Sequence, residues 1–392
     1  MKKILTLIAL MLCLLPQKGW AQGDLGFGES EDATMSLMER VSNIEQKFKA
    51  FNVYVNFAGN GYTQQLTSGG DFETGFKARQ LRLEMKGQIG DHFLYRIRHR
   101  LNRSNVALND NFAKATDIMM IGYRVNPQWL IAFGKMGQYF GGLEFEQNGI
   151  YVYQGSDINN NSDGNKVGIS VTWNPVKGQQ FVAQVTNTYN DSFENEFHNV
   201  WANGVKESKS PLTLVGNWNA TMMDGLLRTS YSYHWRNLAE DTHSQVIILG
   251  QSINGSWGRV YLDYGYEKDD IDFMRFCTPE ASRFLTAKQP YLTDMEYHQL
   301  VARTDVKMGK HLILWAEGMY QTASSGTIKE LRHYRDHYTY MGGIEFVPDP
   351  NYKIRYTLNY QGNRYSYSKE CGLDSYNTNR IEVGILCRLK CF

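Results

Sequence analysis

From residue 51 to the end of the chain, apolar and polar residues alternate with a period of two, the spacing of β-strands that have one apolar and one polar face. The stretch 80–100 (QLRLEMKGQIGDHFLYRIRHR) illustrates the pattern, because apolar residues there alternate with charged ones. The alternation predicts sixteen strands, at residues 51–59, 74–89, 91–101, 115–124, 127–136, 164–173, 178–189, 210–219, 225–236, 244–254, 257–267, 295–308, 311–321, 338–347, 351–361 and 380–392.

The connections between these strands are of two kinds. Every second one is a tight turn built from hairpin-forming residues, such as Gly90-Asp91, Asn126-Pro127 and Gly309-Lys310. The others are long and polar, at residues 60–73, 102–114, 137–163, 190–209, 237–243, 268–294, 322–337 and 362–379. An even strand number with short turns at one end and long loops at the other predicts an all-β protein, a sixteen-stranded antiparallel transmembrane β-barrel with both termini in the periplasm.

The aromatic residues agree with a membrane barrel. The chain has 25 Tyr, 19 Phe and 8 Trp, and Trp129, Trp173, Trp218 and Trp257 all fall at strand ends beside the short turns. That is where an aromatic belt at the membrane interface is expected, whereas the tryptophans of a soluble β-protein scatter through its core. Beyond the N-terminal leader, the sequence has no apolar run long enough for a transmembrane helix.

The N-terminal residues predict export. Lys2 and Lys3, the apolar stretch 4–15 and the small residues around Ala21 form a secretory signal peptide at residues 1–21. Residues 22–50 are expected to be a periplasmic segment that includes a short helix over 37–48, with apolar residues at the spacing of a coiled coil. The barrel domain then spans residues 51–392.

Net charge argues against a nucleic-acid-binding protein. Residues 1–21 carry three lysines and no acidic residue, so their removal leaves 38 of the 41 basic residues against 40 acidic ones. A mature chain with a net charge near −2 has no overall basic excess to attract nucleic acid. The basic character of residues 80–100 must therefore serve a local purpose.

Two segments resemble the phosphate-selective porin O and P family of outer-membrane channels. FETGFKARQLRLEMKGQIGDHFLYRIRHRL, at residues 72–101, is similar to a pair of strands in that family, and IAFGKMGQYFGGLEFEQN, at 131–148, is similar to the segment that enters its third long loop. The resemblance implies a trimer of sixteen-stranded barrels in the bacterial outer membrane, with the third loop folded inward to constrict each pore. It covers residues 72–150 at the level of motifs and the rest at the level of architecture.

Strand parity predicts which charged residues face the water-filled lumen, because a lipid-facing Arg or Lys at mid-bilayer costs about 2–4 kcal/mol. The predicted pore-lining bases are Arg82, Lys86, Arg96, Arg98, Arg100, Arg259, Arg303, Lys353 and Arg355. Such a row raises the local concentration of anions, and guanidinium groups bind carboxylate or phosphate in a bidentate manner. The alternative is that these bases pair with acidic residues such as Glu84, Asp263 and Asp305 and only stiffen the wall.

The third long loop, 137–163, is the predicted constriction. Tyr139, Phe140, Glu144 and Glu146 are its candidate pore-facing residues, and residues 157–161 are expected to be its flexible part. The alternative is a loop that only covers the mouth of the barrel.

Enzymatic and metal-binding hypotheses find little support in the sequence, and we expect no catalytic residues, no metal and no cofactor. The segment HYRDHYTY offers His333, Asp336 and His337, but a third ligand with suitable spacing is not evident. Among the cysteines that follow the leader, Cys277 and Cys371 both lie in polar loops, and whether they pair is left open.

The function predicted from the sequence is an outer-membrane porin for small polar solutes with a mild preference for anions, phosphate among the candidates. Its expected partners are small anionic or polar solutes, outer-membrane lipid and two further copies of the chain, with no nucleic acid. Two alternatives differ in class. One is a non-conducting barrel that serves a structural or surface-binding role, and the other is a soluble, secreted β-sandwich that binds carbohydrate.

Overall fold

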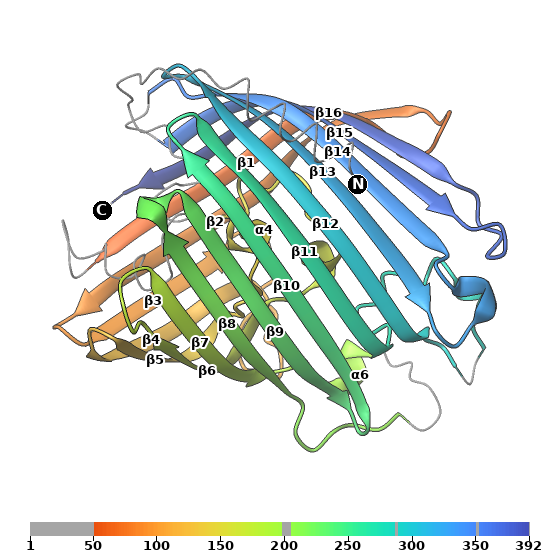
Figure 1. Cartoon of the computed structure of the whole chain (residues 1–392), viewed down its shortest axis with the longest axis horizontal. Coiled ribbons are helices and arrows are strands. Elements are labelled where there is room, and N and C mark those ends of the chain that lie inside the picture. The colour runs from red at the N-terminus through yellow and green to blue at the C-terminus, as the bar shows by residue number, and fades with distance from the viewer. Residues whose placement is uncertain (1–50, 198–204, 287–288, 350–352, 392) are drawn as a thin grey trace.

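A computed structural model describes residues 51–197, 205–286, 289–349 and 353–391. Its strands form a closed barrel in which each is antiparallel to the next along the chain, and the first strand pairs with the last (Figure 1). The predicted sixteen-stranded antiparallel barrel is therefore confirmed. The predicted leader 1–21, the segment 22–50 with its helix and the terminal Phe392 lie outside the described residues.

The strands are β1 (Asn52–Gln65), β2 (Phe72–Ile89), β3 (Phe93–Arg100), β4 (Thr116–Asn126), β5 (Trp129–Gly137), β6 (Asn165–Trp173), β7 (Gln179–Asn187), β8 (Leu212–Met222), β9 (Leu227–Ala239), β10 (Thr242–Gly255), β11 (Gly258–Ile271), β12 (Thr293–Met308), β13 (Leu312–Ser325), β14 (Arg335–Phe346), β15 (Lys353–Tyr367) and β16 (Tyr376–Lys390). Short helices interrupt the loops: α4 (Leu143–Glu146), α5 (Asp157–Asn161), α6 (Phe193–Glu196), η2 (Met223–Gly225), η3 (Ser282–Phe284) and η4 (Lys329–Leu331). Among the described residues, no helix is long and apolar enough to cross a membrane.

Along each strand, apolar residues face outward and polar residues face the interior, which is the reverse of the arrangement in a soluble protein. In β11, Val260 and Leu262 are 41% and 49% exposed on the outer face, while Arg259 and Asp263 are buried in the interior. The same arrangement is found around the barrel. An apolar outer surface and a polar interior are the arrangement that a membrane barrel requires, since lipid cannot solvate charged groups.

The barrel wall is uneven in height. Strands β3 to β7 contain 8 to 11 residues each, whereas β9 to β16 contain 12 to 16. The predicted strands are too short at the long-loop ends of β1, β2 and β9 to β16, whereas at the long-loop ends of β3 to β8 they lie within two residues of the observed bounds. For example, the predicted loop 60–73 contains the last six residues of β1 and the first two of β2. The added end of β1 is mostly polar on both faces, so it lacks the alternation that marks a strand in lipid.

The long loops on the tall side form a compact apolar cluster. Cys277, Leu292, Tyr334 and Cys371 are all fully buried in it. Both cysteines are free thiols in the structure. The cluster joins the β11–β12 and β15–β16 loops to the long-loop ends of the strands between them.

Candidate pore and constriction loop

The loop between β5 and β6 folds into the barrel and begins with two glycines in left-handed backbone conformations. Gly141 has φ 68° and Gly142 has φ 73°, values that side chains with a Cβ rarely adopt. A Cβ at Gly142 would also lie 2.9 Å from Ile248 and 3.0 Å from the Asp263 carboxylate. This tight turn lets the backbone amides of Leu143 and Glu144 donate to Asp263 Oδ2, at 2.6 and 2.7 Å. The loop is thereby attached to β11.

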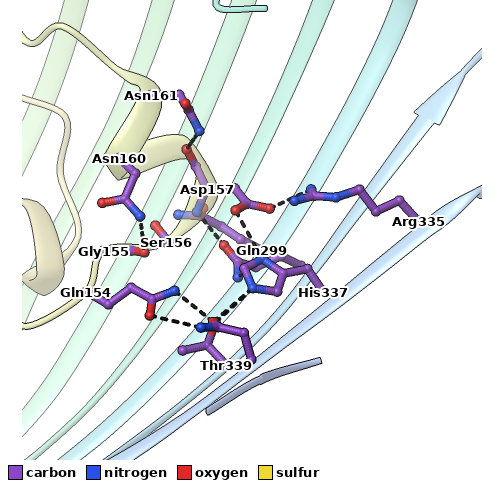
Figure 2. Close-up of polar contacts among 12 residues, drawn as sticks. Gln154, Gly155, Ser156, Asp157, Asn160, Asn161, Gln299, Arg335, His337 and Thr339 are labelled. Atoms are coloured by element: carbon purple, nitrogen blue, oxygen red, sulfur yellow. Dashed lines mark hydrogen bonds and ion pairs between the residues drawn. The ribbon is translucent and has the colours of Figure 1, made fainter. Parts of the chain in front are cut away.

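The tip of the loop is bound to the same side of the barrel (Figure 2). Asp157, the first residue of α5, forms an ion pair with Arg335 Nη1 at 2.7 Å and contacts His337 Nδ1 at 3.1 Å. The backbone amide of Asp157 also donates to Gln321, and that of Ile158 donates to Gln299 Oε1 at 3.2 Å. Residues 157–161, predicted to be flexible, are instead a capped helical turn bound to β12, β13 and β14.

The electrostatic environment of Asp157 favours its charged form. Burial alone would raise the pKa of this carboxyl, but the nearby Arg335 and His337 lower it to about 2. Arg335 also contacts Glu280 in the β11–β12 loop, with Nε 3.3 Å from Oε2. One arginine therefore connects the constriction loop to an outer loop.

The middle of the loop packs against β13, β14 and β15 through two tyrosines. Tyr153 stacks on Trp315 with ring centroids 4.5 Å apart, and its hydroxyl donates to Glu345 Oε1 at 2.9 Å. Tyr151 lies against the guanidinium of Arg355, 4.4 Å from the ring centroid. The loop thus covers this wall, which we call the docking wall and define as the inner faces of β11 to β15.

Arginines on the docking wall are paired with carboxylates. Arg259 Nη2 lies 2.8 Å from Asp305, Arg303 binds both Asp305 at 2.9 Å and Glu317 at 3.2 Å, and Arg355 Nη1 lies 2.6 Å from Glu345. Their side chains are 4–7% exposed. These three predicted pore-lining residues therefore lie on the side of the barrel that the loop covers, and Lys353 is half-buried at the start of β15.

The opposite wall carries the remaining predicted bases. A cavity of about 500 Å³ separates the loop from β2, β3 and β4. The arginines that line it are Arg82, Arg96, Arg98, Arg100 and Arg103. We call this set the arginine wall. Lys86 is buried at the end of the arginine wall nearest the short turns, with its ammonium 5.1 Å from the ring centroid of Tyr54.

The arginine wall has few acidic partners for its charge. Asp117 Oδ2 lies 2.7 Å from Arg100, 3.3 Å from Arg98 and 3.4 Å from Arg82. Glu84 is 2.7 Å from Arg96. The side chains of Arg96, Arg98 and Arg100 remain 25%, 17% and 18% exposed to the cavity. Three guanidinium groups that share one carboxylate leave a local positive charge facing water.

The predicted loop residues lie in different surroundings. Tyr139, Phe140 and Glu146 line the cavity, and Phe140 also stacks on Phe145 with ring centroids 4.8 Å apart. The Glu146 carboxylate is bound to Arg228 and accepts a hydrogen bond from Ser230 at 2.7 Å. Glu144 is buried within the loop, where its carboxylate accepts from the amide and hydroxyl of Ser156 at 2.6 and 2.7 Å.

The sequence did not single out several residues that organise the site. Asp117, Arg103, Asp157, Arg335 and Glu317 are absent from the predicted set of charged lumen residues. Asp117 and Glu317 lie within predicted strands, so a stricter count of strand parity could have found them. Arg103 and Asp157 lie in loops, where parity does not apply, and Arg335 falls just before the predicted start of its strand.

The candidate metal ligands at residues 333–337 point in different directions. His337 faces the barrel interior and contacts Asp157, while Asp336 accepts a hydrogen bond from the outward-facing Tyr320 hydroxyl at 2.9 Å. Among the described residues, no group of three or more His, Cys, Asp or Glu side chains is arranged to hold a metal ion.

A closed barrel with an apolar outer face, a polar interior and an inward-folded third loop defines an outer-membrane porin. The family model of the phosphate-selective porins O and P matches residues 51–387, and the chain belongs to that family. It is therefore an outer-membrane diffusion channel. The family and the fold are those of channel proteins.

Solved structures with the same fold share little sequence with this chain. The outer-membrane channel DcaP of Acinetobacter baumannii is 12% identical, with a TM-score of 0.61, and the match covers 87% of this chain and 99% of that one. The anion-selective porin from Comamonas acidovorans is 10% identical, with a TM-score of 0.57 and the same coverage. The trimer form of OmpT from Vibrio cholerae is 11% identical, with a TM-score of 0.52 and coverage of 87% and 100%. No match was found among curated proteins.

Proposed function

We propose that the cavity between the constriction loop and the arginine wall is the narrowest part of the solute path, and that it gives the channel a mild preference for anions. The observation that supports this proposal is the sharing of Asp117 by three arginines. Among the residues that line the cavity, the one acid is Glu146, which is bound to Arg228. An excess of fixed positive charge in a narrow aqueous path attracts anions and repels cations.

The solutes of the proposal are small polar molecules and anions, including phosphate. Guanidinium groups donate to phosphate and carboxylate oxygens in the same paired geometry, so the arginine wall alone does not favour one of these anions over the other. Diffusion through a channel needs no catalytic group, so the proposal includes no enzymatic role.

The alternative, in which the arginines only stiffen the wall, is better suited to the docking wall. There each arginine is almost fully buried against one or two carboxylates. On the arginine wall, the side chains of Arg96, Arg98 and Arg100 remain about a fifth exposed. Charges that remain solvated and incompletely paired act on passing ions.

Planar-bilayer recordings of the purified mature chain test the proposal. The wild-type channel should give ohmic conductance steps and a reversal potential in a KCl gradient that corresponds to anion preference. Arg96→Glu with Arg98→Glu should lower the chloride-to-potassium permeability ratio about tenfold, because it replaces two positive charges by two negative ones beside the path. Lys310→Glu, in an exposed turn, is the control and should leave the ratio unchanged.

Two results would count against the proposal. An unchanged reversal potential in the double variant would contradict the proposed anion preference but not the channel function. The absence of any conductance steps would instead favour the second candidate, a closed barrel whose long outer loops bind a partner.

We also propose that the chain forms a homotrimer through the outer surface around β3 and β4. β3 has 8 residues, slightly fewer than the roughly 9–11 that a tilted strand needs to cross a bilayer. The outward-facing Phe93 of β3, Ile121 of β4 and Phe133 of β5 are 51–65% exposed. A subunit contact there would cover these residues, and lipid would surround the other strands, β6 to β9 among them. Cross-linking and mass measurement in mild detergent would test the trimer independently of conductance.

A further inference from the structure

The outer surface carries a continuous row of aromatic side chains across β5 to β9, strands that lie side by side in Figure 1. Trp129, Trp173, Phe181, Trp218 and Tyr231 are each the direct cross-strand partner of the next. Successive ring centroids are 5.7, 5.6, 6.5 and 5.6 Å apart. The first four rings lie close to the short turns, at the level where the membrane interface is expected.

A hollow lies immediately beside this row on the side toward the middle of the membrane. Its floor is formed by Ala183 and Gly216, which are cross-strand partners on β7 and β8. Larger side chains surround them, among them Trp218, Tyr233 and Ile247. The hollow is a shallow depression, open to the outside, with a volume of about 670 Å³, and most of its lining is apolar. A Cβ placed on Gly216 would have no heavy atom within 4 Å, so the space above this residue is open.

The two turns below the hollow carry charged residues of opposite sign. Lys177 is exposed in the β6–β7 turn, and Asp224 is exposed in the β8–β9 turn. The amide of Thr221 donates to the Gly178 carbonyl at 2.8 Å, which holds the two turns together. Within the part of the chain that the structure describes, neither Lys177 nor Asp224 has an ion-pair partner.

Exposed apolar residues place these turns at the membrane surface. Val176 is 62% exposed beside Lys177, and Met223 is 72% exposed beside Asp224. An ammonium group and a carboxylate therefore lie at the depth of lipid headgroups, and an apolar hollow lies at the depth of acyl chains. A phospholipid with a phosphate and a primary amine has complementary charges in the same arrangement.

We propose that this surface binds one such aminophospholipid, of the phosphatidylethanolamine type, from the leaflet on the side of the short turns. One acyl chain fills the hollow over Ala183 and Gly216 and rests on the ring of Trp218. The phosphate accepts from Lys177, and the lipid ammonium donates to Asp224. The site lies on the outside of the barrel, so it is separate from the solute path.

Native mass spectrometry of the purified protein, incubated with equal amounts of phosphatidylethanolamine, phosphatidylglycerol and phosphatidylcholine, tests the proposal. We expect phosphatidylethanolamine to be retained about tenfold more than either of the others, because phosphatidylglycerol lacks the amine and phosphatidylcholine lacks its N–H donors. Gly216→Leu should lower this retention about tenfold, because its side chain occupies the hollow. Asp224→Asn should abolish the preference among the three lipids, whereas Lys177→Gln should lower the retention of all three, because each of them has a phosphate.

Gly318→Leu is the matched control. Gly318 is also an outward-facing strand glycine, and a Cβ placed on it would likewise have no heavy atom within 4 Å, but it lies on β13, away from the hollow. This variant should retain lipid as the wild type does, and circular dichroism should show that all variants are folded. Equal retention by Gly216→Leu and the wild type, or equal retention of the three lipids, would overturn the proposal. A change of subunit number in Gly216→Leu would also overturn it, because the hollow would then be a contact between copies.

Discussion

Both inner walls of the barrel carry arginines, but carboxylates neutralise those of the docking wall more completely than those of the arginine wall. On the docking wall, Arg303 binds two carboxylates and is 4% exposed. On the arginine wall, Arg98 shares one carboxylate with two other arginines and is 17% exposed. We infer from this difference that an arginine stabilises the wall when carboxylates neutralise it and a loop covers it, and acts on solute when it is exposed and only partly neutralised.

The largest effect is expected from breaking a pair on the docking wall. Arg303→Met leaves the buried Glu317 without its cationic partner and should lower the free energy of unfolding by about 3 kcal/mol. Arg98→Met on the arginine wall should change it by about 1 kcal/mol or less, because Asp117 keeps two other arginines. Urea unfolding in lipid vesicles, followed by tryptophan fluorescence, measures both. Equal losses in the two variants would contradict the distinction between the walls.

A smaller effect is expected when the loop alone is released from the docking wall. Asp157→Asn removes the ion pair with Arg335, which keeps Glu280, so the loss should be about 2 kcal/mol. Hydrogen–deuterium exchange should become faster in residues 150–162 and stay unchanged on β3. Asp91→Asn, the same chemical change in an exposed turn, is the control.

Acid should weaken the same attachment in a defined range. The pKa of Asp157 is about 2 in the folded chain, below the value of about 3.9 for an unperturbed Asp. A carboxyl with a lowered pKa stabilises the folded state above its unfolded pKa and loses that contribution as pH falls through the folded value. The difference in loop exchange between wild type and Asp157→Asn should therefore be constant from pH 7 to about pH 4 and disappear toward pH 2. A difference that already declines at pH 6 would show that another group controls the loop.

The smallest effects should come from single neutral substitutions on the arginine wall, and they should follow exposure. Arg96→Gln, at 25% side-chain exposure, should lower the anion-to-cation permeability ratio by about twofold. Arg82→Gln, at 6%, should have a smaller effect. Reversal potentials in a salt gradient measure both, with Lys310→Gln as the control. The reverse order would mean that exposure does not decide which arginines meet the solute.

The fold could be predicted from the sequence because lipid imposes alternation on every strand and turn chemistry separates the strands. The chemistry of the site could be predicted only in part. Parity placed Arg98 and Arg303 on the inner face equally well. It could not distinguish them, because the partners Asp117 of β4 and Glu317 of β13 lie on other strands. The contact of Asp157 with the docking wall depends on how a loop of more than twenty residues folds. The sequence of such a loop has no periodic alternation from which its fold could be predicted.

The sharing of Asp117 by three arginines has a consequence for how long an anion would stay at the arginine wall. One carboxylate cannot hold three guanidinium groups at full strength at once, so an arriving anion displaces a weak contact rather than a strong one. Arg96, Arg98 and Arg100 repeat at every second residue, which places them about 7 Å apart along β3. In the proposed solute path, an anion that leaves one of these arginines would therefore be about 7 Å from the next. Such a wall would concentrate anions without retaining any of them for long.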